Sequence, residues 1–460
     1  MASSSHSPAP LAPATGAAQS PGFSLDHYFS VLRETELTPL VGRVVRVVGL
    51  LVESVGPHAR VGEVCEVVGA PGDAPLSVEV VGFQNGHLLS VPLGDTSGIR
   101  PGARLVARGG FASVPVGEAL LGRVLDAFGR PMDGKGPLRG AQKSSLYRAP
   151  VDPLLRQPIT VPIGTGVRAI DAMLTCGRGQ RVGLFGGSGV GKSTLLGMMA
   201  RGTSADVVVL ALVGERGREV RAFLEHDIGP EGIARSVIVC STSDNPPLVR
   251  MRAAYAATAV AEYFRDQGLN VLLMMDSVTR FAMAQREVGL AAGEPPTAKG
   301  YPPSVFALLP SLLERAGNSD RGSITALYTV LVDGDDHNEP IADAVRSILD
   351  GHIVLSRDMA SRNHYPAIDV MQSVSRVISD ITDREHRARV GKVREWLATV
   401  RDSEDLVSVG AYVKGANPRL DTALERRDAV NAFLCQPADT TCRYADAVEA
   451  LQQVTAGAAA

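Results

Sequence analysis

One stretch of the chain, GGSGVGKST at 186–194, constrains the fold more than any other. It matches the pattern G-x-x-x-x-G-K-[ST], and it lies between an apolar run at Arg181–Phe185 and a helix-forming run at Ser193–Ala200. In such a strand, loop and helix context the glycines let backbone N–H groups point inward around phosphate, and the helix N-terminus adds its positive dipole end. The stretch therefore predicts a nucleotide-binding loop.

The polar residues that end this loop have distinct expected roles. Lys192 is expected to bridge the β- and γ-phosphates, Ser193 to give its hydroxyl to Mg²⁺, and Thr194 to donate to an inner phosphate. The residues expected to contact the nucleotide are Gly186, Gly187, Ser188, Gly189, Val190, Gly191, Lys192, Ser193 and Thr194.

Composition narrows the class of protein. A chain of 460 residues that is 45% hydrophobic suggests about three domains with real cores. The formal net charge of -3 offers no broad electrostatic footprint for nucleic acid, so we expect no nucleic-acid partner. The cysteines are scattered without a C-x-x-C pair, which fits a reducing cytoplasm. No apolar run reaches the ~18 residues of a membrane span, and no basic segment is followed by an apolar one near residue 1, so we expect neither membrane insertion nor secretion.

Composition and periodicity divide the chain into parts. An Ala-, Ser- and Pro-rich start predicts disorder, and apolar residues at helical spacing follow it. Short β-rich runs come next, with Asn85-Gly86 as a strong hairpin signal between two of them. The predicted parts are a disordered tail (1–22), a short amphipathic helix (23–37), an N-terminal β-barrel (38–110), a nucleotide-binding domain (111–385) and a C-terminal helical domain (386–460).

The long middle part has the pattern of an α/β fold. Continuous apolar runs alternate with helical segments there, as in a parallel sheet covered on both faces. Residues Leu121–Gly134, punctuated by Gly, Pro and Asp, are interpreted as a connection into this domain. Beyond the first apolar run, the expected strands are Val207–Val213, Val237–Cys240, Val271–Met275 and Ile324–Val332.

Two carboxylates follow apolar strands of this domain, where ligands collect in open parallel sheets. Asp276 follows VLLMM and is expected to hold Mg²⁺ directly or through water. Glu215 follows VVVLALVG and could polarise the attacking water, while Arg216 could organise the site electrostatically. The alternative is a solvated ion-pair cluster at a helix start, made of Glu215, Arg216, Arg218 and Glu219, and spacing alone does not separate the two.

Several longer segments carry a family resemblance. GGSGVGKST, VGERGREV, MMDSVTRFAMAQREVGLAAGEPPTAKGYPPSVFALLP, VLVDGDDHNEPIADAVRSILDGHIVLSR and HYPAIDVMQSVSR resemble the ATPases of type III protein export, flagellar and injectisome. These proteins are related to the catalytic subunits of F-type and V-type rotary ATPases. The similarity runs from about Val41 to Gly415. It implies a RecA-like P-loop core with a parallel sheet, and ATP with Mg²⁺ as the cofactors.

The resemblance also implies roles for individual residues. Glu215 resembles the catalytic glutamate that activates water, and Arg216 its neighbouring phosphate-site arginine. Tyr365, in HYP, resembles the aromatic residue that packs on adenine. Arg376, in SVSR, resembles the arginine finger that reaches into the neighbouring subunit's site. The expected assembly is a homohexamer with sites at the subunit interfaces.

The function implied is the ATP-hydrolysing motor of flagellar type III export, which drives chaperone release and delivers substrates to the membrane gate. The same motor in a virulence-type injectisome is the alternative, and a rotary ATP synthase catalytic subunit is disfavoured by segments such as GERGREV and DGHIVLSR. A nucleic-acid translocase is disfavoured because Leu76–Leu93 offers one aromatic, Phe83, and no Lys or Arg. Expected partners are a stalk protein, a regulatory protein and chaperone–substrate complexes, in the cytoplasm and peripherally at the export gate of the inner membrane.

Overall fold

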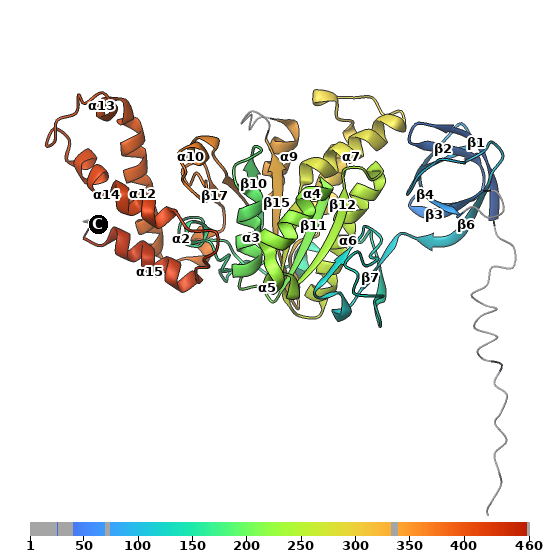
Figure 1. Ribbon diagram of the computed structural model, residues 1–460, viewed down its shortest axis with the longest axis horizontal. Coiled ribbons are helices and arrows are strands. Elements are labelled where there is room, and N and C mark those ends of the chain that lie inside the picture. Colours follow the sequence, from blue (N-terminus) through green and yellow to red (C-terminus); the bar gives the residue numbers. More distant parts are fainter. Residues whose placement is uncertain (1–24, 26–39, 70–73, 333–338, 458–460) are drawn as a thin grey trace, which may run out of the picture.

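The computed structural model describes residues 25, 40–69, 74–332 and 339–457. The predicted tail over 1–22 and, apart from Leu25, the predicted helix over 23–37 lie outside the described residues. The described chain is elongated, with a β-barrel at one end, a sheet with flanking helices in the middle and a helical domain at the other end (Figure 1). The predicted fold class is thereby confirmed.

The N-terminal unit is a closed antiparallel barrel. Its strands follow one another around the barrel in the order β1-β2-β5-β4-β3-β6. The predicted hairpin is present, because Asn85 and Gly86, both with positive φ, connect Gln84 to its partner His87. The strands are β1 (Leu40–Val48), β2 (Leu51–Val55), β3 (Glu63–Val68), β4 (Leu76–Gln84), β5 (His87–Pro92) and β6 (Arg104–Phe111).

The central sheet carries the site. Its strand order is β17-β16-β10-β15-β13-β11-β12-β8, and the pairs from β16 to β8 are all parallel. The edge strand β17 is antiparallel to β16, and β14 pairs with β15 off this path. The strands are β8 (Arg123–Leu125), β10 (Arg181–Gly186), β11 (Val207–Glu215), β12 (Ser236–Thr242), β13 (Asn270–Asp276), β14 (Gly317–Asn318), β15 (Ser323–Leu331), β16 (Gly351–Val354) and β17 (Val374–Ser375).

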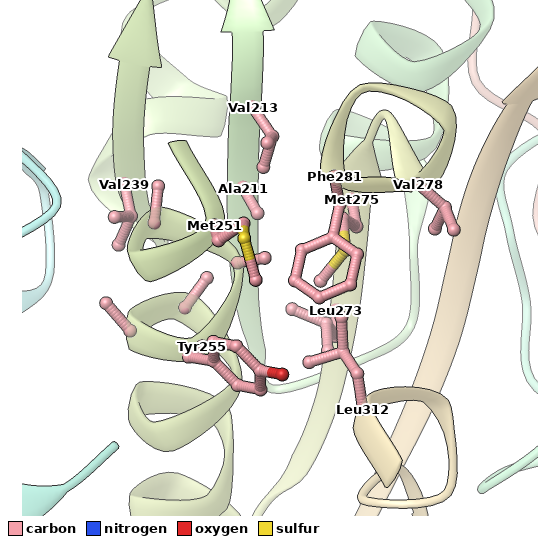
Figure 2. Packing of buried hydrophobic residues seen from close by; sticks show 14 of the residues in the cluster. Ala211, Val213, Val239, Met251, Tyr255, Leu273, Met275, Val278, Phe281 and Leu312 are labelled. Carbon is pink, nitrogen blue, oxygen red and sulfur yellow. The ribbon is translucent and has the colours of Figure 1, made fainter. Parts of the chain in front are cut away.

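Both faces of this sheet are buried, as the continuous apolar strands predict. Along β11, Val209 and Ala211 belong to one core while Val208 and Leu210 belong to a second core on the opposite face. Figure 2 shows the first core, in which Tyr255 and Phe281, from two helices, pack against β11 and β13.

The helices lie on both sides of the sheet and around the C-terminus. They and the remaining short elements are β7 (Ser113–Val116), η1 (Glu118–Leu120), β9 (Gln142–Ser145), η2 (Pro153–Leu155), α2 (Arg168–Met173), α3 (Lys192–Gly202), α4 (Gly217–Ala222), η3 (Phe223–Ile228), α5 (Gly229–Ala234), α6 (Pro247–Asp266), α7 (Val278–Ala291), η4 (Ala298–Gly300), α8 (Pro303–Leu313), α9 (Pro340–Ile348), α10 (Arg357–Ser361) and α11 (Ile378–Ile381). None of the described helices is both long and apolar enough to cross a membrane.

One segment interpreted as a connection contains part of the sheet. Within Leu121–Gly134, the short run Arg123–Leu125 forms β8 and pairs in parallel with Val237–Val239 of β12. Glycine, proline and aspartate on either side conceal this strand, because so short a run has no periodicity of its own.

The C-terminal domain packs on the sheet domain through α2. Arg168 of α2 donates hydrogen bonds to the carbonyls of Phe433 (2.6 Å) and Ala432 (2.9 Å), at the end of α14. Trp396 is buried in the interior of this domain. Its helices are α12 (Arg384–Asp402), α13 (Glu404–Ser408), α14 (Pro418–Leu434) and α15 (Tyr444–Thr455).

Candidate active site

The phosphate loop joins β10 to α3. The strand ends at Gly186, the helix begins at Lys192, and Gly191 between them is left-handed, with φ 84° and ψ 21°. The left-handed backbone favours glycine at this position, and a Cβ atom built on it would lie 3.4 Å from Cε1 of Tyr365, at van der Waals contact. Val190 is buried and anchors the loop in the core, whereas Ser193 and Thr194 are exposed on the first turn of α3. The loop thus has the geometry that an anion needs at a helix N-terminus.

Lys192 and Asp276 meet across the loop and the sheet. The Lys192 ammonium lies 2.8 Å from Oδ1 of Asp276, which is the last residue of β13. The same oxygen accepts a hydrogen bond of 2.6 Å from Thr329 on the neighbouring strand β15. Parallel pairing of β13 with β15 therefore places both the carboxylate and its hydroxyl partner beside the loop.

Glu215 ends β11, one strand away from Asp276. Gly214 is an extra residue in the pairing of β11 with β12, and beyond this bulge Glu215 lies opposite Thr242. Burial raises the pKa of the Glu215 carboxyl, and the nearby Asp276 carboxylate raises it further, while Lys192 and Arg280 oppose the shift. A half-buried carboxylate with a raised pKa, close to a phosphate loop, is suited to accept a proton from water.

The two arginines near Glu215 differ in environment. Arg216 is exposed, and its guanidinium lies 3.2 Å from the Glu219 carboxylate. In this structure Arg216 therefore forms a surface ion pair, as the alternative to a role at the phosphate site predicts. Arg280, on the first turn of α7, is half-buried, and its Nε has no hydrogen-bond partner among the described residues. Sequence reasoning missed Arg280. A signal for it in the sequence was its position four residues after Asp276, at the start of the helix that follows β13.

Tyr365 lies beside the phosphate loop although it is far from it in the sequence. Its ring approaches Gly191, and the side chain is 41% exposed. Its carbonyl accepts a hydrogen bond from the backbone N–H of Gln436, which follows α14. An exposed aromatic face next to a phosphate loop is available for stacking on a base.

Arg376 lies elsewhere on the sheet domain. It follows β17, and its backbone N–H donates to the carbonyl of Asp350, the residue before β16. Its side chain is exposed and forms no hydrogen bond or ion pair with a described residue. The structure therefore brings together the loop, Asp276, Glu215 and Tyr365, and leaves Arg376 apart from them.

The oxygen donors of the site fit Mg²⁺. Magnesium prefers hard oxygen ligands and is commonly held by one or two carboxylates together with substrate phosphates. The Asp276 carboxylate and the exposed Ser193 hydroxyl supply such donors, at the end of β13 and on the first turn of α3.

A phosphate loop on a mostly parallel sheet, with an acid at the end of each of two neighbouring strands, defines a P-loop nucleoside triphosphatase. Models of the ATP synthase alpha/beta family match residues 44–109 as its β-barrel domain and 166–375 as its nucleotide-binding domain, and residues 382–453 match the T3SS EscN ATPase C-terminal domain. The chain is 55% identical to the flagellum-specific ATP synthase of Treponema pallidum (strain Nichols), over 93% of this chain and 96% of that protein. The chain belongs to the family of type III export ATPases, flagellar and secretion-system, which is related to the ATP synthase alpha and beta subunits.

Other relatives show the same two branches of the family. The type 3 secretion system ATPase of Xanthomonas euvesicatoria is 51% identical over 90% of this chain and 94% of that protein. The solved structure of the assembled ATPase EscN from the enteropathogenic E. coli type III secretion system is 46% identical, with a TM-score of 0.85 over 90% of this chain and 100% of that one. EscN has also been solved in complex with its central stalk, EscO.

Proposed function

We propose that this ATPase is the motor of a flagellar export apparatus, where it releases export substrates from their chaperones and delivers them to the membrane gate. The observation that carries this assignment is the 55% identity to a flagellum-specific relative over nearly the whole chain. A secretion-system relative at 51% identity makes an injectisome the second candidate. The genes beside the coding sequence separate the two, since hook and basal-body genes support the first and needle genes the second.

The proposed hydrolysis uses groups that the fold places around the loop. Lys192 and the loop N–H groups hold the phosphates of ATP, and Ser193 with Asp276 would hold Mg²⁺, which would neutralise phosphate charge. Glu215 accepts the proton of the attacking water, and its raised pKa makes the carboxylate a stronger base for that transfer. Tyr365 packs on adenine. Arg216 contributes positive charge to the phosphate site once it leaves Glu219.

Arg376 is proposed to act on the neighbouring subunit's site. Because β17 runs antiparallel to β16, Arg376 lies level with Asp350 and Arg181, at the edge where the parallel strands begin. The chain's own phosphate loop begins at the opposite end of β10, about 16 Å away at the usual rise of a strand. An arginine side chain does not span that length and then reach a γ-phosphate. This topology supports action in trans.

The proposed assembly is a homohexameric ring around a stalk protein. One chain carries the phosphate loop, Glu215 and Arg376, so identical copies could supply both halves of every site. EscN, which has the same fold, assembles and binds a central stalk, and we extend both properties to this chain. The barrels would form the crown of the ring, and the C-terminal helices would face the stalk, a regulatory protein and chaperone–substrate complexes at the cytoplasmic side of the inner membrane.

The test is steady-state ATP hydrolysis measured against protein concentration, with Arg376→Ala added to the wild type in a second series. Shared sites require specific activity to rise with concentration and to fall as the variant joins the rings. Sizing each sample by light scattering distinguishes a preformed ring from a monomer. A fully active monomer would contradict both the ring and the role of Arg376.

A further inference from the structure

The segment that carries Arg376 alternates between buried and exposed side chains. Ser373 is 0% exposed and Ser375 9% exposed, whereas Val374 and Arg376 point to solvent. This is the alternation of an edge strand, with every second residue facing inward. The two serines therefore fix the backbone, and Arg376 extends outward from it.

Gln180 holds this segment from within the sheet domain. Its side chain is fully buried, directly before β10. Its Nε2 donates to the carbonyl of Asp350 (3.0 Å) and to Oγ of Ser375 (3.2 Å). The Asp350 carbonyl also accepts a hydrogen bond from the backbone N–H of Arg376 (3.0 Å). The Gln180 amide therefore contacts both Ser375, the residue before Arg376, and the carbonyl that holds the Arg376 backbone.

Further contacts keep this arrangement in place. Oε1 of Gln180 accepts the N–H of Gly177 (2.9 Å), which orients the amide so that Nε2 faces Asp350 and Ser375. The Ser375 hydroxyl donates to the carbonyl of Thr175 (2.9 Å). Each hydrogen-bonding group of this cluster thus has a partner, which makes it rigid.

The packing around the amide is close. A Cβ atom on Gly351 would lie 2.6 Å from the carbonyl oxygen of Val374 and 3.2 Å from Nε2 of Gln180. The side chain of Asp350 is held from the other direction, because its carboxylate accepts two bonds of 3.0 Å from the guanidinium of Arg181. The backbone before Arg376 is therefore fixed on both sides.

We propose that Gln180 is a positioning residue that aims Arg376 at the neighbouring subunit's nucleotide site. This inference rests on the proposed action of Arg376 in trans. Gln180 touches neither nucleotide nor the reacting atoms, and its effect passes through Asp350 and Ser375. A displacement of about 1 Å of a catalytic group can lower a rate ~100-fold, so a rigid amide behind an otherwise unsupported arginine is functionally significant.

The alternative is that Gln180 acts on its own subunit, because it directly precedes β10, which leads to the phosphate loop. Mixing two inactive variants separates these possibilities. Gln180→Leu keeps its own loop and has a misplaced Arg376, whereas Lys192→Ala has no working loop and a well-placed Arg376. In rings assembled at random from equal amounts of the two variants, roughly one interface in four combines the intact loop of a Gln180→Leu subunit with the well-placed Arg376 of a Lys192→Ala subunit.

Gln180→Leu alone should lower kcat at least ~10-fold, because Arg376 is misplaced, while its affinity for a fluorescent ATP analogue stays within about 2-fold of the wild type. Mixing it with Lys192→Ala should restore hydrolysis. Ser375→Ala, a smaller change in the same cluster, should show a weaker defect that is restored in the same way. Thr258→Val, which removes the buried hydrogen bond from Thr258 to Ala254, controls for loss of stability alone and should remain active.

The reference mixture is Arg376→Ala with Lys192→Ala. One result would overturn this inference and leave the proposed function standing. In that result hydrolysis recovers in the reference mixture but not in the mixture of Gln180→Leu with Lys192→Ala, which would mean that Gln180 acts on its own subunit's site. If the reference mixture does not recover, the trans arginine of the proposed function fails, and the inference with it. Full activity of Gln180→Leu by itself, with the protein folded by circular dichroism, would also overturn the inference.

Discussion

Lys192 and Asp276 form an ion pair of 2.8 Å that joins the first turn of α3 to the end of β13. Thr329 donates to the same carboxylate oxygen, so three elements that are distant in the sequence meet at one atom. The pair is largely buried, which strengthens the attraction between its charges. Lys192 is thus oriented before ATP arrives, and the loop, β13 and β15 are held as one unit.

Removing this lysine should abolish nucleotide binding. Lys192→Ala takes away the cation that faces the β- and γ-phosphates and leaves the Asp276 carboxylate unpaired beside them. Titration with a fluorescent ATP analogue should show a loss of affinity of ~100-fold or more. Lys414→Ala, which removes an exposed lysine paired with Glu425, is the matched control and should bind normally. Near-normal affinity of Lys192→Ala would contradict its role.

The sequence was sufficient to predict the loop and the strands around it, because these depend on local pattern. Continuous apolar runs correctly predicted β11 and β13, and an acid after each run placed Glu215 and Asp276 at adjacent strand ends. Asn85-Gly86 correctly predicted a hairpin, since few other dipeptides adopt two positive φ values so readily.

Contacts between distant segments could not be predicted from local pattern. Nothing in the sequence around Tyr365 indicates that its ring faces Gly191, because that contact forms only when β16 pairs with β10 and brings the chain after β16 beside the loop. Thr329 lies within a largely apolar run, and nothing in that run indicates a role at the site. Its hydrogen bond to Asp276 results from the pairing of β13 with β15. The contacts of Gln180 with Asp350 and Ser375 likewise appear only in the assembled fold.

Glu215→Gln should separate binding from hydrolysis. The amide keeps the size of the side chain but accepts no proton from water, so kcat should fall ~100- to 10,000-fold with little change in nucleotide affinity. Phosphate release assayed in parallel with nucleotide titration measures both. Glu225→Gln removes an exposed carboxylate paired with Arg221 and should hydrolyse ATP normally. Turnover at the wild-type rate in Glu215→Gln would remove Glu215 from the mechanism.

The raised pKa of Glu215 also predicts the pH dependence. Its ordinary value is 4.5 and burial raises it, so the acid limb of kcat/KM in the wild type should have its midpoint above pH 4.5. The folded form then binds the proton more tightly than the unfolded form. The resulting contribution to stability is present below pH 4.5 and is lost as pH rises through the folded-state pKa. Denaturation of the wild type and Glu215→Gln at a series of pH values measures this difference.

Tyr365→Ala should weaken ATP binding by removing the aromatic surface beside Gly191. Stacking of a base on an aromatic ring contributes about 1–3 kcal/mol, so the Kd should rise roughly 5- to 150-fold. Tyr365→Phe keeps the ring and should bind like the wild type. Comparing both variants by calorimetry with ATP tests stacking against a contribution of the hydroxyl, and equal affinities of Tyr365→Ala and the wild type would exclude contact with the base.

Arg315 and Glu262 form a buried ion pair between α6 and the end of α8. Two hydrogen bonds of 2.8 Å join them, both side chains are at most 2% exposed, and Arg315 also donates to the carbonyl of Leu146 (2.6 Å). Glu262 lies on α6 and Arg315 follows α8, so the pair connects two helices on the same face of the sheet.

Arg315→Met should therefore lower the free energy of unfolding by an amount toward the lower end of about 3–5 kcal/mol. The variant removes both hydrogen bonds to the buried Glu262 carboxylate and leaves only the half-exposed guanidinium of Arg148, 3.7 Å away, to balance its charge. The double variant Glu262→Met with Arg315→Met should be more stable than Arg315→Met alone, since no uncompensated charge then remains in the core. Urea denaturation of each variant measures the difference. Arg321→Met, at an exposed arginine, controls for the substitution itself. If Arg315→Met unfolds at the wild-type midpoint, the pair contributes no net stability, and the packing of α6 against α8 must rest on apolar contacts alone.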